Sequence, residues 1–149
     1  MAGVTSDQGW GDVVGITVFG VSLNDGMAAE VDEGGNPIGS SSGGDTHGNH
    51  FLIGAEVISR LAISVFDCHP ARLQALRNDI CTKGPLSFSV PQLNSKSTAP
   101  TLSVSVVGSY ALLLGISQPF RYKDRTLNTL TFELQSPNGT SSALTTESA

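Results

Sequence analysis

The chain has 149 residues and a formal net charge of −5, from 13 acidic and 8 basic side chains. Only 14% of the residues are charged, whereas 19 serines, 12 threonines and 17 glycines supply most of the polar surface. This balance excludes a basic nucleic-acid-binding domain, a charge-rich disordered chain and a coiled coil. Two cysteines are too few for a disulfide scaffold. A single β-rich globular domain remains.

The N-terminal region predicts an arm followed by a hairpin. Residues 1–12 are polar, contain glycine and lack the cationic start and apolar run of a signal peptide, so we expect a flexible arm. Residues 13–23 are apolar and β-branched, which predicts a strand. Asn24-Asp25-Gly26 is a hairpin turn signal, since Asp and Gly tolerate positive φ. Residues 27–31 would form the returning strand.

Residues 32–50 have an unusual composition, with two glycine pairs, a proline and three consecutive serines. Such a segment cannot bury enough apolar surface to offset its ordering entropy, which predicts a long loop. Loops of this length inside a domain are usually functional. Asp45, His47 and His50 could approach a metal ion. No regular element holds their geometry, however, so we predict solvated side chains and no metal site.

The central region predicts a strand followed by a helix. Residues 51–66 alternate, with Leu61, Ile63 and Val65 on one face, which indicates a central strand. A helix is predicted over residues 70–83, because Pro70 suits its first turn and Gly84 can supply a left-handed cap. Asp67 carries the charge that favours a helix N-terminus. Leu73, Leu76 and Ile80 would form its apolar stripe.

The C-terminal half predicts three or four further strands. Apolar residues alternate with serine or threonine over residues 86–90, 102–106 and 129–135, and residues 110–117 form a third apolar run. Residues 136–149 are rich in serine and threonine, and we expect a disordered tail. The fold class is therefore mainly β, a β-sandwich or barrel-like set of antiparallel sheets with one flanking helix, in a single domain over residues 13–135.

Motifs of catalysis and cofactor binding are weak. No phosphate-binding Gly-Lys-Ser/Thr occurs, and the match to Gly-x-Ser-x-Gly at residues 39–43 falls within the Gly/Ser-rich segment, not at a strand-to-helix turn. Cys68-His69 are sequence neighbours, whose side chains usually point apart. We expect Cys68 and Cys81 to be reduced, buried, small apolar side chains. We therefore predict that the protein is not an enzyme and has no cofactor.

Charge is distributed unevenly along the chain. Residues 1–56 contain eight acids and no Lys or Arg, whereas residues 57–149 contain all eight basic residues and five acids. One interpretation is that the solvated loops are simply acidic. The other is head-to-tail stacking of identical subunits. A concentrated acidic hairpin would also repel a polyanion such as DNA.

The order of elements resembles the tail-tube proteins of long-tailed bacteriophages. The resemblance covers residues 13–135 and consists of an N-terminal strand pair, a long Gly/Ser-rich loop, residues 56–67 leading into the helix, the strand at 86–90 and a closing strand at 127–135. It implies a β-sandwich with one flanking helix, whose subunits form hexameric rings that stack into a tube. The Ser/Thr faces of the strands would then line the channel.

The resemblance also implies residue roles. Candidate channel-lining residues are Glu30, Asp32 and Glu33. The loop at 32–50 would contact the next ring, and Trp10, a lone tryptophan on the arm, would either anchor to another subunit or pack on its own domain. The candidate inter-subunit contacts are Trp10, Gly34, Gly35, Pro37, Ser41, Gly44, His47 and His50.

The sequence therefore predicts a self-assembling virion structural protein, a tail-tube subunit assembled in the host cytoplasm. Its partners would be copies of itself and other virion tail proteins, with DNA only as non-specific cargo and no membrane. One alternative is a head-decoration or head–tail connector protein. A further alternative is a β-sandwich ligand-binding module, which predicts exposed aromatic residues clustered on one face.

Overall fold

The computed structural model describes residues 8–9, 13–40, 50–93 and 101–148. These residues form one α-helix and nine β-strands. In chain order the elements are β1 (Gln8–Gly9), β2 (Val14–Val18), β3 (Val21–Leu23), β4 (Gly26–Ser40), β5 (His50–Val65), α1 (Pro70–Asn78), β6 (Lys83–Leu93), β7 (Thr101–Ser117), β8 (Asn128–Leu134) and β9 (Leu144–Ser148).

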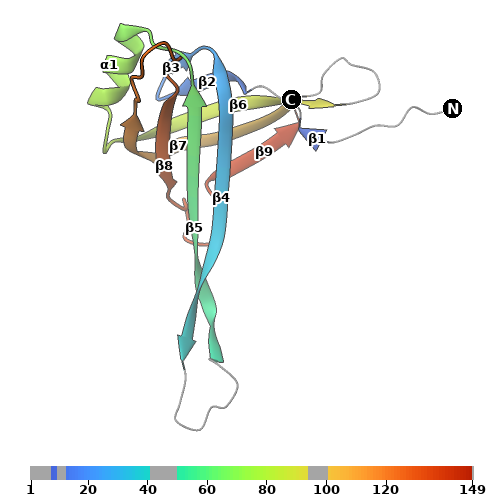
Figure 1. The fold of residues 1–149 in the computed structure, drawn as a ribbon. Helices are drawn as coiled ribbons and strands as arrows, with labels where there is room; N and C mark the ends of the chain where they lie inside the picture. Colours follow the sequence, from blue (N-terminus) through green and yellow to red (C-terminus); the bar gives the residue numbers. More distant parts are fainter. Residues whose placement is uncertain (1–7, 10–12, 41–49, 94–100, 149) are drawn as a thin grey trace, which may run out of the picture.

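All strand pairings are antiparallel. The order along the sheet is β3-β2-β6-β7-β8-β5-β4, with β1 added to β6 and β9 added to β7. β4, β5 and β8 run along the long axis of the molecule, whereas β6 and β9 run across it (Figure 1). The sheet thus curls, and within the described residues its two end strands, β3 and β4, do not pair with each other.

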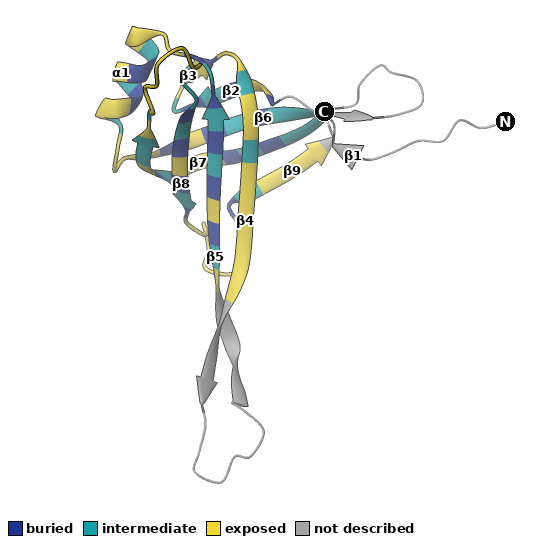
Figure 2. Ribbon diagram, in the orientation of Figure 1, coloured by how far each residue is buried: buried dark blue, intermediate teal, exposed yellow. Residues whose placement is uncertain are grey.

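One hydrophobic core lies inside the curl, and α1 packs beside one end of it (Figure 2). The alternating patterns predicted this core: Leu61, Ile63 and Val65 of β5 are buried, as are Leu130 and Phe132 of β8. The predicted fold class, mainly β and antiparallel with one flanking helix, is confirmed for the described residues.

The helix begins where the sequence predicts but ends earlier. α1 starts at Pro70 and buries Leu73 and Leu76. It stops at Asn78, so the predicted range 70–83 is wrong. The following residues turn back, and the amide of Cys81 donates to the carbonyl of Leu113 on β7 (2.8 Å). Cys81 adopts the positive φ that the sequence assigned to Gly84. This attachment to the sheet ends the helix.

The first hairpin turn is at Phe19-Gly20, and the prediction of a turn at Asp25-Gly26 that pairs residues 13–23 with 27–31 is wrong. β2 pairs with β3 across Phe19 and Gly20, which both have positive φ. This two-residue turn matches strand twist, but Phe is an unusual residue for it. Its ring has a tertiary role, because it packs edge-on against Phe132 at a centroid distance of 6.1 Å.

The predicted loop at 32–50 is largely strand. β4 continues to Ser40 and β5 begins at His50, with paired positions from Gly26↔Val65 to Ser40↔His50. Residues 41–49 lie outside the described part of the chain. Composition misled the prediction, because backbone pairing in an exposed ribbon needs little apolar surface.

Two further expectations are corrected in the C-terminal half. Residues 101–117 form a single strand, β7, in which Gly108 takes a positive φ of 79°. The tail predicted to be disordered is ordered as far as Ser148, since β9 pairs with β7 from Leu144↔Val106 to Ser148↔Leu102. The domain therefore extends beyond residue 135. Of the predicted arm, the structure describes Gln8–Gly9, which pair with β6.

Candidate assembly surfaces

The most prominent feature is a two-stranded ribbon formed by the distal parts of β4 and β5. β8 pairs with β5 only from Ser59 to Val65. Beyond that point, residues 34–40 of β4 and 50–58 of β5 pair with each other, and they project away from the body of the molecule (Figure 1). Seven strand residues span about 23 Å. Among the candidate contact residues, Gly34, Gly35, Pro37 and His50 all belong to this ribbon.

β4 is also an edge strand. Within the described residues it pairs on one side only, with β5, and it is exposed along most of its described length (Figure 2). Val31 lies opposite buried Leu61 yet is 39% exposed, and Val57 is 64% exposed. A long edge with unpaired backbone groups and uncovered apolar side chains is a template for pairing with another chain.

The three candidate channel-lining acids do not share a face. Glu30 lies opposite Ala62 and Asp32 opposite Arg60, whereas Glu33 lies opposite Ser59. Because side chains alternate along a strand, Glu30 and Asp32 point to the outer face and Glu33 to the core side. All three are exposed.

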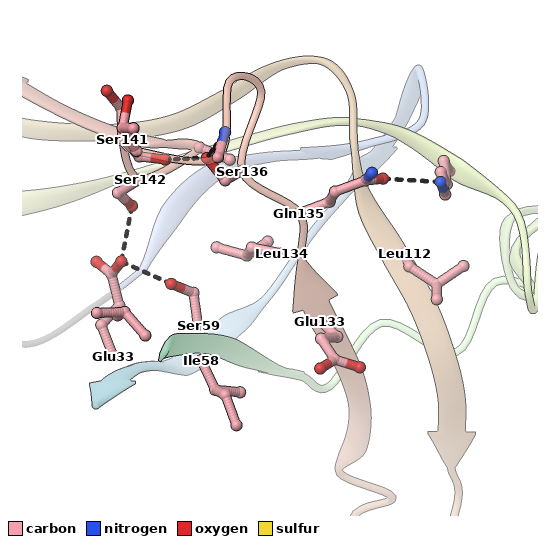
Figure 3. Close-up of a pocket in the computed structure, with 15 residues that line it drawn as sticks. Glu33, Ile58, Ser59, Leu112, Glu133, Leu134, Gln135, Ser136, Ser141 and Ser142 are labelled. Atoms are coloured by element: carbon pink, nitrogen blue, oxygen red, sulfur yellow. Dashed lines mark hydrogen bonds between the residues drawn. The ribbon is translucent and has the colours of Figure 1, made fainter. Parts of the chain in front are cut away.

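Glu33 is committed to hydrogen bonds with the body. Its Oε2 accepts a hydrogen bond from the Ser59 hydroxyl (2.7 Å) and another from the Ser142 hydroxyl (2.7 Å), as Figure 3 shows. These bonds fasten the 136–142 turn to the base of the ribbon. The same turn is held by Asn138, whose Oδ1 accepts hydrogen bonds from the amides of Thr140 and Ser141.

The outer face beside Glu30 and Asp32 carries small polar side chains. Successive strands there place Ser64 beside Thr129 and Ser117, and Ala62 beside Thr131 and Gly115. Ser64 and Thr129 share a hydrogen bond of 3.2 Å. None of these residues is fully buried. This face combines the Ser/Thr side that was predicted for the strand at 129–135 with the charged pair Arg60 and Glu133.

A hollow of about 850 Å³ lies at the base of the ribbon (Figure 3). Glu33, Ser59, Lys83, Glu133 and Gln135 line it. Lys83 Nζ donates to Gln135 Oε1 (2.7 Å), and the hydroxyls bond to Glu33. These polar side chains of the hollow thus hydrogen-bond to one another. The described residues contain no group of three or more His, Cys, Asp or Glu side chains placed to hold a metal ion.

At the opposite end of the sheet, a polar network holds the helix. Asp67 is buried, and its carboxylate accepts hydrogen bonds from Arg72 Nε (2.8 Å) and Nη2 (3.0 Å), and from the amides of Asn24 and His69 (both 2.9 Å). Burial raises the pKa of Asp67, but the hydrogen bonds and the Arg72 charge outweigh it and hold the pKa below its usual value. Asn128, fully buried, donates to the Asp67 carbonyl (2.8 Å).

A loop between β7 and β8 carries an exposed aromatic pair near this network. Phe120 is 76% exposed and Tyr122 is 89% exposed, and they alternate with the cationic residues Arg121 and Lys123. The sequence analysis missed this loop, although the signal was present as aromatic and basic residues alternating directly after Pro119. Strand aromatics such as Phe88 and Phe132 are internal.

The remaining candidates have different outcomes. Trp10, Ser41, Gly44 and His47 lie outside the described residues, so their predicted contacts are not placed. Cys68 and Cys81 are both free and exposed, which corrects the expectation that they are buried. Both flank α1, where the chain enters and leaves the surface-bound helix.

No helix among the described residues combines the length and the apolar character needed to cross a membrane. Searches with models of known protein families and against curated protein sequences find no match to this chain.

Proposed function

We propose that this protein is a structural subunit that assembles with copies of itself. The observation that carries the proposal is the β4–β5 ribbon, which continues past the last pairing with β8. An isolated two-stranded ribbon is marginally stable in water. Contact with a neighbouring subunit would supply the burial that the monomer does not provide.

The edge of β4 supports the same proposal. It leaves a row of backbone groups and the apolar Val31 and Met27 exposed. Natural proteins usually blunt such edges with charged side chains, above all lysine, with proline, with bulges or with a covering segment. Between Gly26 and Gly35 this edge carries acidic side chains and a register shift at Gly26/Ala28, but no lysine, no proline and, within the described residues, no covering strand. A strand added here by a second copy would continue the sheet from one subunit to the next.

The finer proposal follows the resemblance in element order. A tail-tube subunit would stack in rings around a DNA-conducting channel, and the hydroxyl-rich outer face would line it. Glu30 and Asp32 lie on that face and would repel the phosphate backbone. Glu33 lies on the opposite face, so it is no longer among the proposed lining residues.

A second candidate is favoured by one observation. Phe120 and Tyr122 are exposed together on one loop, which is the feature that distinguishes a ligand-binding module. Aromatic rings displayed in this way stack on sugars and other flat ligands.

Removal of the ribbon leaves the pairing of β5 with β8 unchanged, because that pairing begins at Ser59. Gly34 lies opposite Ile58, so residues 35–57 can be replaced by Asn-Gly, which favours a two-residue hairpin turn. We expect the shortened protein to melt cooperatively, because the core residues of β5 lie between Leu61 and Val65. We expect it to lose assembly, measured by light scattering and negative-stain imaging.

The control is the full-length chain at the same concentration. Rings or tubes formed by the full-length protein and a monomer formed by the shortened one would support the proposal. A full-length protein that remains monomeric at high concentration, or a shortened protein that assembles equally well, would contradict it.

A further inference from the structure

The loop over residues 119–125, here called the aromatic–basic loop, carries large side chains that are exposed and do not belong to the hydrophobic core. Phe120 and Tyr122 are among the most exposed large hydrophobic residues of the chain. Lys123 Nζ lies 5.4 Å from the centroid of the Tyr122 ring. Arg121 is exposed beside them. Aromatic residues and arginine are the side chains enriched at the centres of protein interfaces.

The aromatic–basic loop is held in place at both ends. Before it, Gln118 Nε2 donates to Oδ1 of the buried Asn128 (3.0 Å). At its end, the Arg125 guanidinium lies 3.8 Å from the centroid of the Phe66 ring. Between them, the amide of Asp124 donates to the carbonyl of Arg121 in a turn (3.3 Å). The fold therefore positions the exposed rings, and a partner meets a surface that is already formed.

We propose that the aromatic–basic loop docks on the β4 edge of a second copy of this chain, in the region of Glu30 and Asp32. This inference rests on the proposed self-assembly, and it gives Glu30 and Asp32 a contact role in place of the channel-lining role. Glu30 and Asp32 are exposed on the outer face of that edge, and the apolar Val31 is exposed on its other face. The edge thus offers carboxylates for Arg121 and Lys123 and apolar surface for the rings. Arg60, the cross-strand partner of Asp32, lies beside those carboxylates, and residues 1–56 add no further Lys or Arg.

The two surfaces are separated within one subunit. The aromatic–basic loop leads into Asn128, which pairs with Val65 at the end of β5. Asp32 pairs with Arg60, five residues and about 17 Å further along the same strand. A contact between two different surfaces of identical subunits is head-to-tail, so it propagates to a ring or a filament.

The exposed cations Arg121 and Lys123 favour a second copy of the chain over a sugar as the partner of the loop. Neutral sugars stack on aromatic rings without needing flanking positive charge. Here two exposed cations alternate with the rings, in a chain whose acids are concentrated elsewhere on its own surface. Complementary charges of this kind steer association and fix its register.

A charge swap tests the inference. We expect Arg121→Glu/Lys123→Glu to raise the protein concentration needed for half-assembly at least about tenfold, since two attractive contacts become repulsive. Glu30→Lys/Asp32→Lys should have the same effect. The variant with all four substitutions restores opposite charges across the contact and should assemble at close to the wild-type concentration.

Two controls accompany the swap. Gln74→Glu/Lys83→Glu lowers the net charge by three at two exposed positions outside the loop and its anchors, and it should assemble like the wild type. Phe120→Ser/Tyr122→Ser leaves the charges unchanged and should also weaken assembly. Cooperative melting of every variant shows that the fold is retained.

The outcomes separate this inference from the proposed function. A wild-type protein that never assembles overturns both. Assembly of the wild type that is unaffected by Arg121→Glu/Lys123→Glu, or a loss that the four-substitution variant does not recover, overturns the docking contact alone. Binding of glycans or of DNA that is lost in Phe120→Ser/Tyr122→Ser, with assembly intact, assigns the loop to that ligand and also overturns it.

Discussion

Asp67 connects three parts of the chain that are distant in sequence. Its carboxylate accepts from Asn24 at the β3–β4 junction and from Arg72 on α1, and its carbonyl accepts from Asn128 at the start of β8. The aromatic–basic loop is attached to the same network through Gln118. Asp67 therefore holds the helix through its carboxylate, and the loop proposed as a docking surface is attached through its main-chain carbonyl.

Replacing Asp67 should be costly. Asp67→Ala leaves the Arg72 charge and two amides without their acceptor, and we expect the free energy of unfolding to fall by about 2–4 kcal/mol. Urea denaturation measures it. The exposed Asp124→Ala is the matched control and should change it by less than about 1 kcal/mol. Equal effects of the two substitutions would contradict the structural role of Asp67.

The same carboxylate makes stability depend on pH. The pKa of Asp67 is lowered in the folded state from its ordinary value of 3.8, so its contribution is complete above that value and is lost as the pH falls through the lowered pKa. The stability difference between wild type and Asp67→Asn should therefore shrink below about pH 4. A difference that stays constant down to pH 2 would show that ionisation of Asp67 does not contribute.

The sequence predicted part of this network. It placed Asp67 at the N-terminus of a helix, because Pro70 and the leucine spacing are local signals. It did not predict the bonds to Asn24 and Asn128, which lie 43 and 61 residues away. Such partners become neighbours only through the order of the strands.

β6 passes close to the first hairpin turn. Gly84 is buried, and a Cβ atom there would overlap the Phe19 ring. That ring in turn packs against Phe132. The absence of a side chain at Gly84 lets a phenylalanine occupy a tight turn, so the residue interpreted as a helix cap serves strand packing.

Gly84→Ala should therefore destabilise the fold. Overpacking a core usually costs about 1–3 kcal/mol, and we expect a loss in that range by urea denaturation. Gly115→Ala is the matched control within a strand, because a Cβ atom there meets nothing within 4 Å. A loss at Gly115 as large as that at Gly84 would argue against the contact with Phe19.

The strands that bury one face were predicted from alternation, whereas the ribbon was not. Leu86, Phe88 and Leu130 are buried and alternate with polar residues along their strands, so the sequence shows a period of two there. The distal parts of β4 and β5 pair only with each other, beyond the body of the molecule. No core lies against them, so their sequence lacks this alternation. Glycine pairs and serines then resemble a loop, although paired positions continue as far as Ser40↔His50.

At the scale of the whole molecule, the sheet order determines where the charges lie. Three of the eight acids of residues 1–56 lie on the edge strand β4, and three of the eight basic residues lie in the aromatic–basic loop near the other end of β5. Charge segregation was visible in the sequence. Its placement on two separated surfaces was not, because β4 could be assigned to the edge only once its pairing with β5 was known.

This separation predicts that assembly weakens with salt. The Debye length falls from about 10 Å at 0.1 M to about 3 Å at 1 M ionic strength, so exposed charges on facing subunits attract each other less. We expect the concentration for half-assembly, measured by light scattering, to rise about tenfold between 0.05 and 0.5 M NaCl. The melting temperature of the shortened protein lacking the ribbon should change little, because its core is apolar. If apolar contacts dominate instead, salt will leave assembly unchanged or strengthen it, and the acidic edge will then have no part in holding subunits together.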